Sequence, residues 1–513
     1  MDIVLAAVPL IVVLTLMVGF RWSGSKAGAA GWISALVIAL LRFGVGAEAL
    51  FWAQVQGFFR AVYVLYIIWG ALFFFRVTEA DGTLRSMSEM LRQLAPGRIL
   101  QLLLLAWGFT SFLQGVGGFG VPVAVVAPIL VTMGVPALDA VVMASLGHSW
   151  AVSFGSLGAS YEALVTATGL DGAIIAPWMS IMLGLVCFAV GFIVLWIAAG
   201  KKLPRREIVP MLSMATAMVL VQYLSVRVGI ENIAAMLGSL AGIIVGALWA
   251  SIRRRQSDEF ETAPMQARQT VLKMLPYLLL IAVIFAVNFI PSLNALLNRW
   301  VVAVQVPALT LQDGTQITAS RTKSISIFGH PGAQLIYAAL IALLLARRRN
   351  SLPAGSGEII RKGVVKSGTK STLGILAMMT MATTMQVGGM VSELATAMAA
   401  LAGQFFPVIS PWIGALGAFM TGSNTNSNVL LGAFQLQVAQ ALGLQVPLIL
   451  ALHNAGAAAG SIFAPAKIIV GCSTVGLSGG ESDALRNTAR YGVIVITIVA
   501  VIGLLVTQFA PVG

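Results

Sequence analysis

Long apolar runs separated by short polar connections constrain the fold of this chain more than any other feature of its sequence. Twelve such runs can be drawn, and most come near the roughly 20 residues that an α-helix needs to cross a bilayer. Hydrophobic residues make up 58% of the chain and charged residues only 10%, whereas about a quarter of the residues in a typical soluble protein are charged. We therefore predict an all-α polytopic membrane protein. The runs are 3–20, 29–46, 56–75, 137–163, 173–199, 209–228, 232–252, 272–295, 325–346, 373–392, 447–470 and 489–510.

Several other classes of protein are disfavoured by the sequence. The net charge of +13 comes from short basic connections, which the positive-inside rule explains without any nucleic acid. Two cysteines are too few to indicate a disulfide framework or a metal site. Neither a Walker sequence nor the spacing of a hydrolase appears, so we expect no ATP hydrolysis and no enzyme. The first run lacks a preceding basic segment and a clear cleavage site, and we expect it to be retained as a helix.

Two segments, 99–134 and 408–446, are apolar at both ends but rich in glycine or asparagine in the middle. Each half is too short to cross a bilayer comfortably, so we expect re-entrant hairpins. Non-helical backbone survives at membrane depth only where protein or a wet cavity satisfies its polar groups. About twelve transmembrane helices and two re-entrant hairpins follow.

The two hairpins occupy matched places in the chain. The intervals from Phe112 to His148 and from Phe419 to His453 are 36 and 34 residues, and each histidine is followed by a Gly-Ser pair at the same distance. Interrupted spans at corresponding places in two halves indicate a transporter whose site lies at the interface of the repeats. We therefore expect the two interruptions to meet near the middle of the bilayer.

The distribution of Lys and Arg predicts the orientation. The basic connections all fall on one side, which we assign to the cytoplasm, so both termini are predicted outside. Hairpin 99–134 then enters from the cytoplasm and hairpin 408–446 from the exterior, which makes the repeat inverted. The basic connections are Arg21–Lys26, Arg76–Arg98, Lys201–Arg206, Arg253–Lys273 and Arg347–Lys370. The predicted units are scaffold helices 1–98, a first transport-domain half 99–200, connecting and scaffold helices 201–407, and a second transport-domain half 408–513.

The first interruption offers backbone groups to an anion. Its glycines leave N–H and C=O groups bare, and Pro122 suits the first turn of a new helix, whose positive end favours a carboxylate. The alternative is close glycine packing between helices. The candidate site residues here are Gln114, Gly115, Gly117, Gly118 and Gly120.

The second interruption offers side chains. Seven of the eight residues from Thr421 to Asn428 carry a hydroxyl or an amide. Their oxygens suit a hard monovalent cation such as sodium, and their N–H and O–H groups suit an organic anion. The alternative is an exposed loop. The candidate site residues are Ser423, Asn424, Thr425, Asn426 and Asn428.

Ionisable groups inside the remaining spans complete the candidate site, because such groups at depth are functional hypotheses by default. A histidine can also be a packing residue, and Lys467 can instead direct its ammonium to the membrane edge. His330 is expected at the membrane interface, and Glu162 near the outer end of its span. The candidates are His148, Ser156, His453, Asn454, Ser461 and Lys467.

Three segments, Phe112–Ala124, Phe419–Val429 and Asn454–Asp483, together resemble signatures of the L-lactate permease family, whose members transport lactate and glycolate. The resemblance covers most of the chain by the order of its spans. It implies the architecture of the broader ion-transporter superfamily, in which hairpins and broken helices form a mobile domain. It therefore implies an elevator mechanism and often a homodimer.

Three positions depart from the family pattern, which has Glu in place of Gln114, Asp in place of Asn424 and a neutral polar residue in place of Lys467. The coupling ion, proton or sodium, therefore stays open. Ser423-Asn-Thr425 resembles the motif of divalent anion–sodium symporters, which suggests sodium near these three residues.

The sequence thus predicts a secondary active transporter of a small carboxylate, L-lactate or a related 2-hydroxy acid, by cation-coupled symport. It needs no cofactor besides the coupling ion, and it is expected in the bacterial inner membrane. The alternatives are a sodium-coupled transporter of another small organic anion and, from a different class, an anion channel.

Overall fold

The computed structural model describes residues 2–20, 22–94, 97–118, 121–200, 202, 204–256, 267–312, 314, 316–477 and 480–509. The chain is mostly helical. The first half contains α1 (Asp2–Val18), α2 (Gly24–Leu41), α3 (Ala47–Ala80), α4 (Thr83–Leu94), α5 (Arg98–Leu103), the π-helix η1 (Leu104–Phe109), α6 (Thr110–Val116), α7 (Val121–Thr132), α8 (Ala137–Gly147), the 3₁₀ turn η2 (Ser149–Ala151), α9 (Ala159–Thr168), α10 (Gly172–Ala198), α11 (Arg205–Arg227) and α12 (Glu231–Gln256).

The second half begins with α13 (Ala267–Phe289) and ends with a long apolar helix. It contains also α14 (Pro291–Leu297), α15 (Pro331–Arg348), α16 (Ser356–Val387), α17 (Met390–Ala402), the 3₁₀ turn η3 (Gly403–Phe405), α18 (Phe406–Thr421), α19 (Asn424–Ala441), α20 (Val446–Gly460), the 3₁₀ turn η4 (Ser461–Phe463), α21 (Pro465–Thr474) and α22 (Glu481–Phe509).

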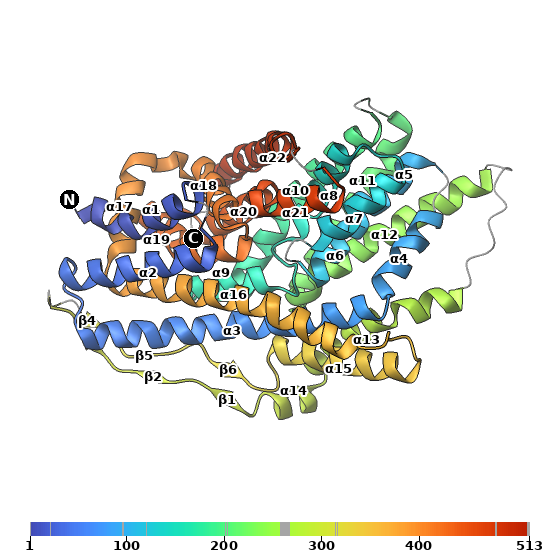
Figure 1. The fold of residues 1–513 in the computed structure, drawn as a ribbon. Coiled ribbons are helices and arrows are strands. Elements are labelled where there is room, and N and C mark those ends of the chain that lie inside the picture. The colour runs from blue at the N-terminus through green and yellow to red at the C-terminus, as the bar shows by residue number, and fades with distance from the viewer. Residues whose placement is uncertain are drawn as a thin grey trace.

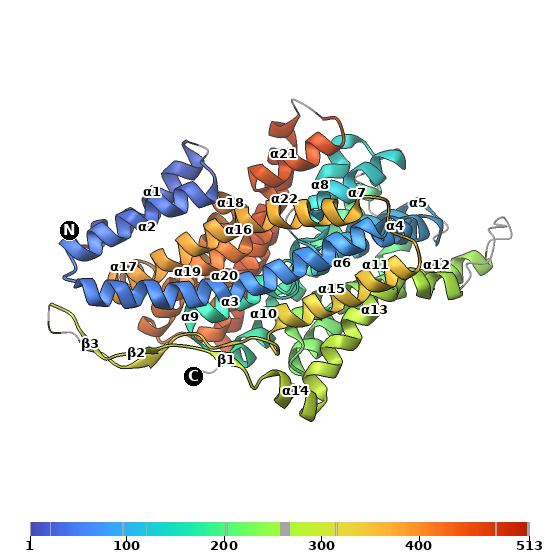
Figure 2. The ribbon, with the colours of Figure 1, turned by 60° about the horizontal axis from the view of Figure 1, so that its bottom comes forward.

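The long helices α3 and α16 lie side by side and run through much of the molecule (Figures 1 and 2). Glycine permits their close approach, because a Cβ on Gly57 would lie 2.6 Å from Thr383 Oγ1 and 2.8 Å from Thr380 Cα. Small residues at helix interfaces let backbones approach in this way. Helix α2 packs along α16 and α1 packs on α2, while α15 packs along α3 and α13 packs on α15 (Figure 2).

Both segments that the sequence predicts as hairpins form pairs of helices. In the first, α5, η1 and α6 run continuously from Arg98 to Val116, and α7 returns. The first arm is 19 residues long, so it is longer than we expected of a hairpin arm. In the second, α18 ends at Thr421, Gly422 adopts φ +69°, and α19 begins at Asn424.

The two broken helices also lie where the sequence places them. The predicted span 137–163 is α8 followed by an irregular segment and α9, and the predicted span 447–470 is α20, η4 and α21. Within the described ranges, nine helical runs are long and apolar enough to cross a membrane, or ten if α13 and α14, bent by 89°, count as one. The count of twelve spans stays a prediction.

Two connections between the predicted spans differ from the expected loops. The connection before α15 forms a long antiparallel ribbon of short strand pairs, which lies along α3 (Figure 1). Two-residue strands give no alternating pattern in the sequence, so the prediction missed them. The strands are β1 (Val301–Val302), β2 (Gln305–Val306), β3 (Leu309–Thr310), β4 (Gln316–Ile317), β5 (Ser320–Arg321) and β6 (Ile325–Ser326), paired β1–β6, β2–β5 and β3–β4.

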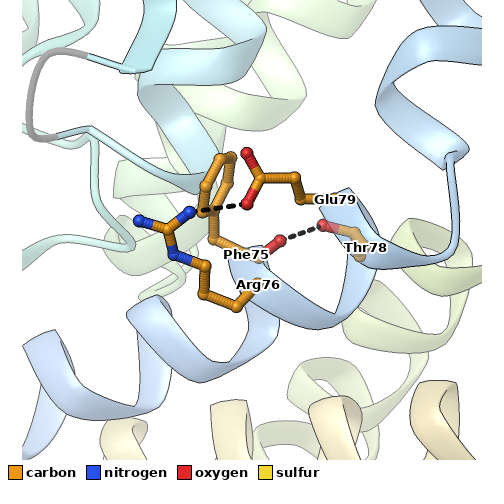
Figure 3. A network of polar contacts seen from close by, with 4 residues as sticks. All are labelled: Phe75, Arg76, Thr78 and Glu79. Carbon is orange, nitrogen blue, oxygen red and sulfur yellow. Dashed lines mark hydrogen bonds and ion pairs between the residues drawn. The ribbon is translucent and has the colours of Figure 1, made fainter. Parts of the chain in front are cut away.

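The basic connection Arg76–Arg98 is also helical rather than a loop. The end of α3 is held by an ion pair of 2.7 Å between Arg76 and Glu79, and Thr78 Oγ1 donates to the carbonyl of Phe75 at 2.9 Å (Figure 3). Pairs three residues apart are neighbours on one face and support a helix. Helix α4 follows after one turn. Residues 257–266 of the basic connection Arg253–Lys273 lie outside the described residues.

Candidate functional site

The break between α8 and α9 is an unwound segment clamped by the first hairpin. Ser156 and Leu157 adopt φ +47° and +56°, a region that costs a non-glycine residue roughly 1–2 kcal/mol. Their N–H groups donate to the carbonyls of Gln114 at 2.8 Å and Gly115 at 3.1 Å. The freed carbonyls at the end of α6 therefore satisfy the freed N–H groups of the break, as membrane depth requires.

Gly118 completes this contact. It has φ +55°, and a Cβ placed on it would overlap Ser156 Oγ. A side chain is thus excluded on both conformational and steric grounds. Gly117 instead packs on the ring of Phe75. Gly117 therefore fits the alternative of close glycine packing between helices. Gly120 lies outside the described residues.

A buried cluster of amides and hydroxyls joins the two halves. We call Ser153, Asn424, Asn428 and Asn454 the amide cluster; none is more than 2% exposed. Asn454 Nδ2 donates to Ser153 Oγ at 2.7 Å, and Asn428 Nδ2 donates to Asn454 Oδ1 at 3.0 Å. Asn424 Nδ2 donates to Ser153 Oγ at 3.0 Å and lies 3.4 Å from Asn454 Oδ1.

Helix α9 closes the cluster with its first turn. Asn428 Nδ2 donates to the carbonyl of Ser160 at 2.8 Å, and the hydroxyls of Ser160 and Thr425 lie 2.7 Å apart. Ser153 and Ser156 belong to the same short segment, so both interruptions lie against it. The structure therefore brings the two interruptions together.

Two acceptors in the cluster are left over. A backbone carbonyl fixes the orientation of Asn428, because only the Nδ2 end can donate to Ser160. With the amides so oriented, Asn424 Oδ1 and Asn428 Oδ1 have no hydrogen-bond partner in the part of the chain that the structure describes. A buried unsatisfied polar atom costs about 1–3 kcal/mol. An amide oxygen of this kind can accept from the hydroxyl of a bound molecule or bind a cation.

The N-terminus of α19 points into the same region, because Asn424 and Thr425 are its first residues. Ser423 caps the helix, with its hydroxyl accepting from the N–H of Asn426 at 3.3 Å. The positive end of a helix favours an anion. The Asn426 side chain is only half-buried and lies near Gly24 of α2, outside the amide cluster.

The two histidines are not structurally equivalent. His148 caps the end of α8, and its Nδ1 lies 2.9 Å from the carbonyl of Ala144. His453 lies inside α20, which continues to Gly460 before it breaks at η4. The two histidines therefore lie at different distances from the ends of their helices, although each precedes a Gly-Ser pair at a break. Both rings are fully buried.

Lys467 stands in the first turn of α21. Its Nζ donates to Ser461 Oγ at 3.1 Å, and its ammonium lies close enough to His148 to act on that ring electrostatically. Among the described residues no ion-pair partner lies within 4.0 Å of this ammonium. Ser461 follows Asn454 by roughly two helical turns (~10 Å). Lys467 thus supplies positive charge beside the amide cluster rather than within it.

Glu162 adds a carboxylate on the other face of α9. It faces the hydroxyl of Tyr63 on α3. Lys323, between β5 and β6, places its ammonium 4.5 Å from the centre of the Tyr63 ring. Burial lowers the pKa of the Lys323 amine, and the Glu162 carboxylate opposes this shift by raising it. His330 is buried between Tyr63 and Tyr66 at the start of α15.

Sequence reasoning missed two members of this region, Ser153 and Ser160. Both lie within the broken span that the sequence does identify, and Ser160 precedes Tyr161 and Glu162. A signal was available, because hydroxyls in the apolar span around an unwound segment are candidates to satisfy its freed backbone groups.

Comparison with known proteins gives one family over nearly the whole chain. The model of the L-lactate permease family matches residues 2–510. The chain is 28% identical to an L-lactate permease of Streptococcus iniae (86% of this chain, 91% of that protein) and 28% identical to one of Bacillus subtilis (97% and 94%). It is 25% identical to the glycolate permease of Escherichia coli (98% and 95%). Among solved structures, the YdaH transporter of Alcanivorax borkumensis matches with a TM-score of 0.49 and 14% identity, over 90% of this chain and 88% of that one.

Proposed function

The chain belongs to the L-lactate permease family, and from that premise we propose that it is a secondary active transporter of L-lactate or a closely related 2-hydroxy acid. It is a multi-pass membrane protein, and relatives of similar length are named as permeases of lactate and of glycolate. The observation that carries the proposal is the pair of unpartnered oxygens, Asn424 Oδ1 and Asn428 Oδ1, beside the start of α19.

The chemistry of a 2-hydroxy acid fits this arrangement. Its hydroxyl can donate to one of the two free amide oxygens, and its carboxylate is favoured by the positive end of α19. Lys467 adds a positive charge about two turns away, which favours any anion in a region of low dielectric. A plain carboxylate without the hydroxyl leaves the amide oxygens without a donor, so we expect the site to prefer hydroxy acids.

A second candidate is a sodium-coupled transporter of another small organic anion. Amide and hydroxyl oxygens are hard ligands, and those left over in the amide cluster suit a monovalent cation as well as a hydroxyl. Under this candidate the free oxygens hold sodium and the anion binds nearby. The identity of the coupling ion, proton or sodium, distinguishes the two candidate functions.

We further propose an elevator mechanism in which segments 99–200 and 408–513 move together. Three described contacts support it, because Asn424, Asn428 and Thr425 of the second segment all bond to Ser153 or Ser160 of the first. The moving unit would then be held by its own polar core while it slides past helices such as α3 and α16.

Uptake of labelled L-lactate into proteoliposomes tests the proposal. We expect accumulation above the external concentration when a proton or a sodium gradient is imposed, with competition by unlabelled glycolate. The two gradients are imposed separately, so the dependence identifies the coupling ion. Rapid equilibration without accumulation under either gradient would support an anion channel and overturn the proposal.

A further inference from the structure

Arg60 is a cation inside the protein that the amide cluster does not use. It lies on α3, and its Nη1 donates to Gln386 Oε1 of α16 at 2.8 Å. Among the described residues no acidic partner lies within 4.0 Å of this guanidinium. Arg42 provides a contrast, because it is more exposed and pairs with Asp2 at 2.7 Å. Arg60 is half-buried. A charge partly withdrawn from water with only a neutral partner is costly, and in a transporter it is a functional hypothesis.

A large open pocket adjoins this arginine. The pocket has a volume of about 730 Å³ and lies where the α16–α17 turn meets the strand ribbon and the start of α3. Its lining includes Arg42, Gln56, Gln312 and Gln386. Gln386 is thus both a wall of the pocket and the partner of Arg60, and Gln56 precedes Arg60 by one turn on α3. An anion at this wall need only displace one amide oxygen to reach the guanidinium.

Charges around the pocket allow a small anion to enter. Lys323 lies close enough to Arg60 to act on it electrostatically, so two cations share this region. Asp2 also lines the pocket but is paired with Arg42, and Glu393 lines it but is exposed to solvent. Solvent screens an exposed charge far more strongly than a buried one.

Gln386 also holds the end of α9. Its Nε2 donates to the carbonyl of Ala167 at 3.1 Å, in the last turn of that helix. The first turn of α9 carries Ser160, which contacts the amide cluster. Gln386 therefore connects the pocket, Arg60 and helix α9, which closes the proposed site.

We propose that this pocket is a capture site for a small carboxylate, in which Arg60 binds the anion before it reaches the amide cluster. The anion takes the place of Gln386 Oε1 on the guanidinium. Gln386 is then free to turn, and its hold on Ala167 is released, which loosens α9. This inference rests on the proposed transport function, and by the predicted orientation the pocket opens to the exterior.

The test compares Arg60→Gln with Arg299→Gln, because Arg299 is an exposed arginine that does not line this pocket. Initial rates of L-lactate uptake are measured at increasing lactate concentration. We expect Arg60→Gln to raise KM about tenfold, as loss of one charge-assisted hydrogen bond to a carboxylate implies, with partial recovery in Arg60→Lys. Arg299→Gln should leave KM within about twofold of the wild type. Equal KM values in the two variants would overturn the proposal.

A second measurement does not need transport. The thermal unfolding midpoint of the purified protein is recorded with and without L-lactate, and with acetate as a carboxylate lacking the hydroxyl. We expect both anions to stabilise the wild type and Arg299→Gln, and acetate to lose its effect in Arg60→Gln. If the wild-type protein transports no lactate, the proposed function is refuted. The unfolding midpoint with and without acetate still tests whether the capture site exists. Equal stabilisation by acetate in the wild type and in Arg60→Gln would refute the capture site alone.

Discussion

Replacing Asn454 by Leu perturbs the amide cluster at its centre while keeping the size of the side chain. Asn454 donates to Ser153 at 2.7 Å and accepts from Asn428 at 3.0 Å and from Asn424 at 3.4 Å. Leucine removes all three contacts. Asn428 keeps the carbonyl of Ser160, and Ser153 keeps the amide of Asn424, so no remaining donor is left entirely without a partner.

The expected magnitude follows from the two short bonds. A typical hydrogen bond contributes about 0.5–1.5 kcal/mol net, and bonds between membrane helices average about 0.6 kcal/mol. Two of them give roughly 1–3 kcal/mol. Asn424 then keeps only its bond to Ser153, and Asn428 keeps only its bond to Ser160. Because both amides are held by fewer bonds, we expect most of this loss to appear in substrate binding. At about 1.4 kcal/mol per tenfold, the apparent KM should rise roughly 5- to 100-fold.

The assay is uptake of labelled L-lactate by proteoliposomes, with thermal unfolding in detergent as a parallel measure. Gln435→Leu is the matched control, because Gln435 is a fully buried amide of α19 that accepts from Ser410 at 2.8 Å away from the helix breaks. We expect this control to lower the unfolding temperature with little change in KM. The reasoning is refuted if Asn454→Leu keeps the wild-type KM, or if both variants raise KM equally.

Three further substitutions test other parts of the site. Gly118→Ala should abolish uptake, because φ is +55° and the new Cβ overlaps a neighbouring hydroxyl. Gly46→Ala is the control and should transport normally, because the space around Gly46 is open. Uptake at matched protein levels distinguishes the two variants. Lys467→Gln should raise the KM for lactate several-fold or change its dependence on sodium and pH, and a variant identical to the wild type in all three would show that this charge plays no part. Glu162→Gln should flatten the response of uptake to an imposed proton gradient, because Glu162 is the one carboxylate in the described parts of α6, α9, α19 and α20; an unchanged response would exclude it as a proton carrier.

The sequence predicts the helix breaks well because their cause is local. Glycine and asparagine in an apolar run of limited length cannot continue an ordinary span, so hairpins 99–134 and 408–446 and both broken helices can be located without tertiary information. The strand ribbon could not be predicted in the same way. Its strands are two residues long and depend on pairing across the ribbon. The ribbon is also held to the segment before α3, where the N–H of Gln312 donates to the carbonyl of Gly44 at 3.1 Å.

The composition of the sequence predicted the region of the site but not which side chains form it. The polar residues at the start of α19 identify the region, but they do not tell which side chains turn inward. Asn424 and Asn428 are four residues apart and share one face of α19, whereas Asn426 points elsewhere. The histidines show the opposite error, since equal spacing in sequence suggested equal roles, while α8 ends at His148 and α20 continues past His453.

Helix α9 is the element through which the pocket lined by Gln386 and the amide cluster can act on each other. It has ten residues and is bounded by Gly158 and Gly169, whose φ values are +83° and +74°. Its first turn bonds to the second repeat and its last turn to Gln386. A helix of roughly 15 Å moves as a rigid body, and terminal glycines can absorb the backbone rotation that such motion needs. Release of the Gln386 contact therefore lowers the resistance to any tilt that opens the cluster, and an anion held among the amides opposes that tilt. The two sites should consequently be coupled, and reciprocally so, without any contact between them.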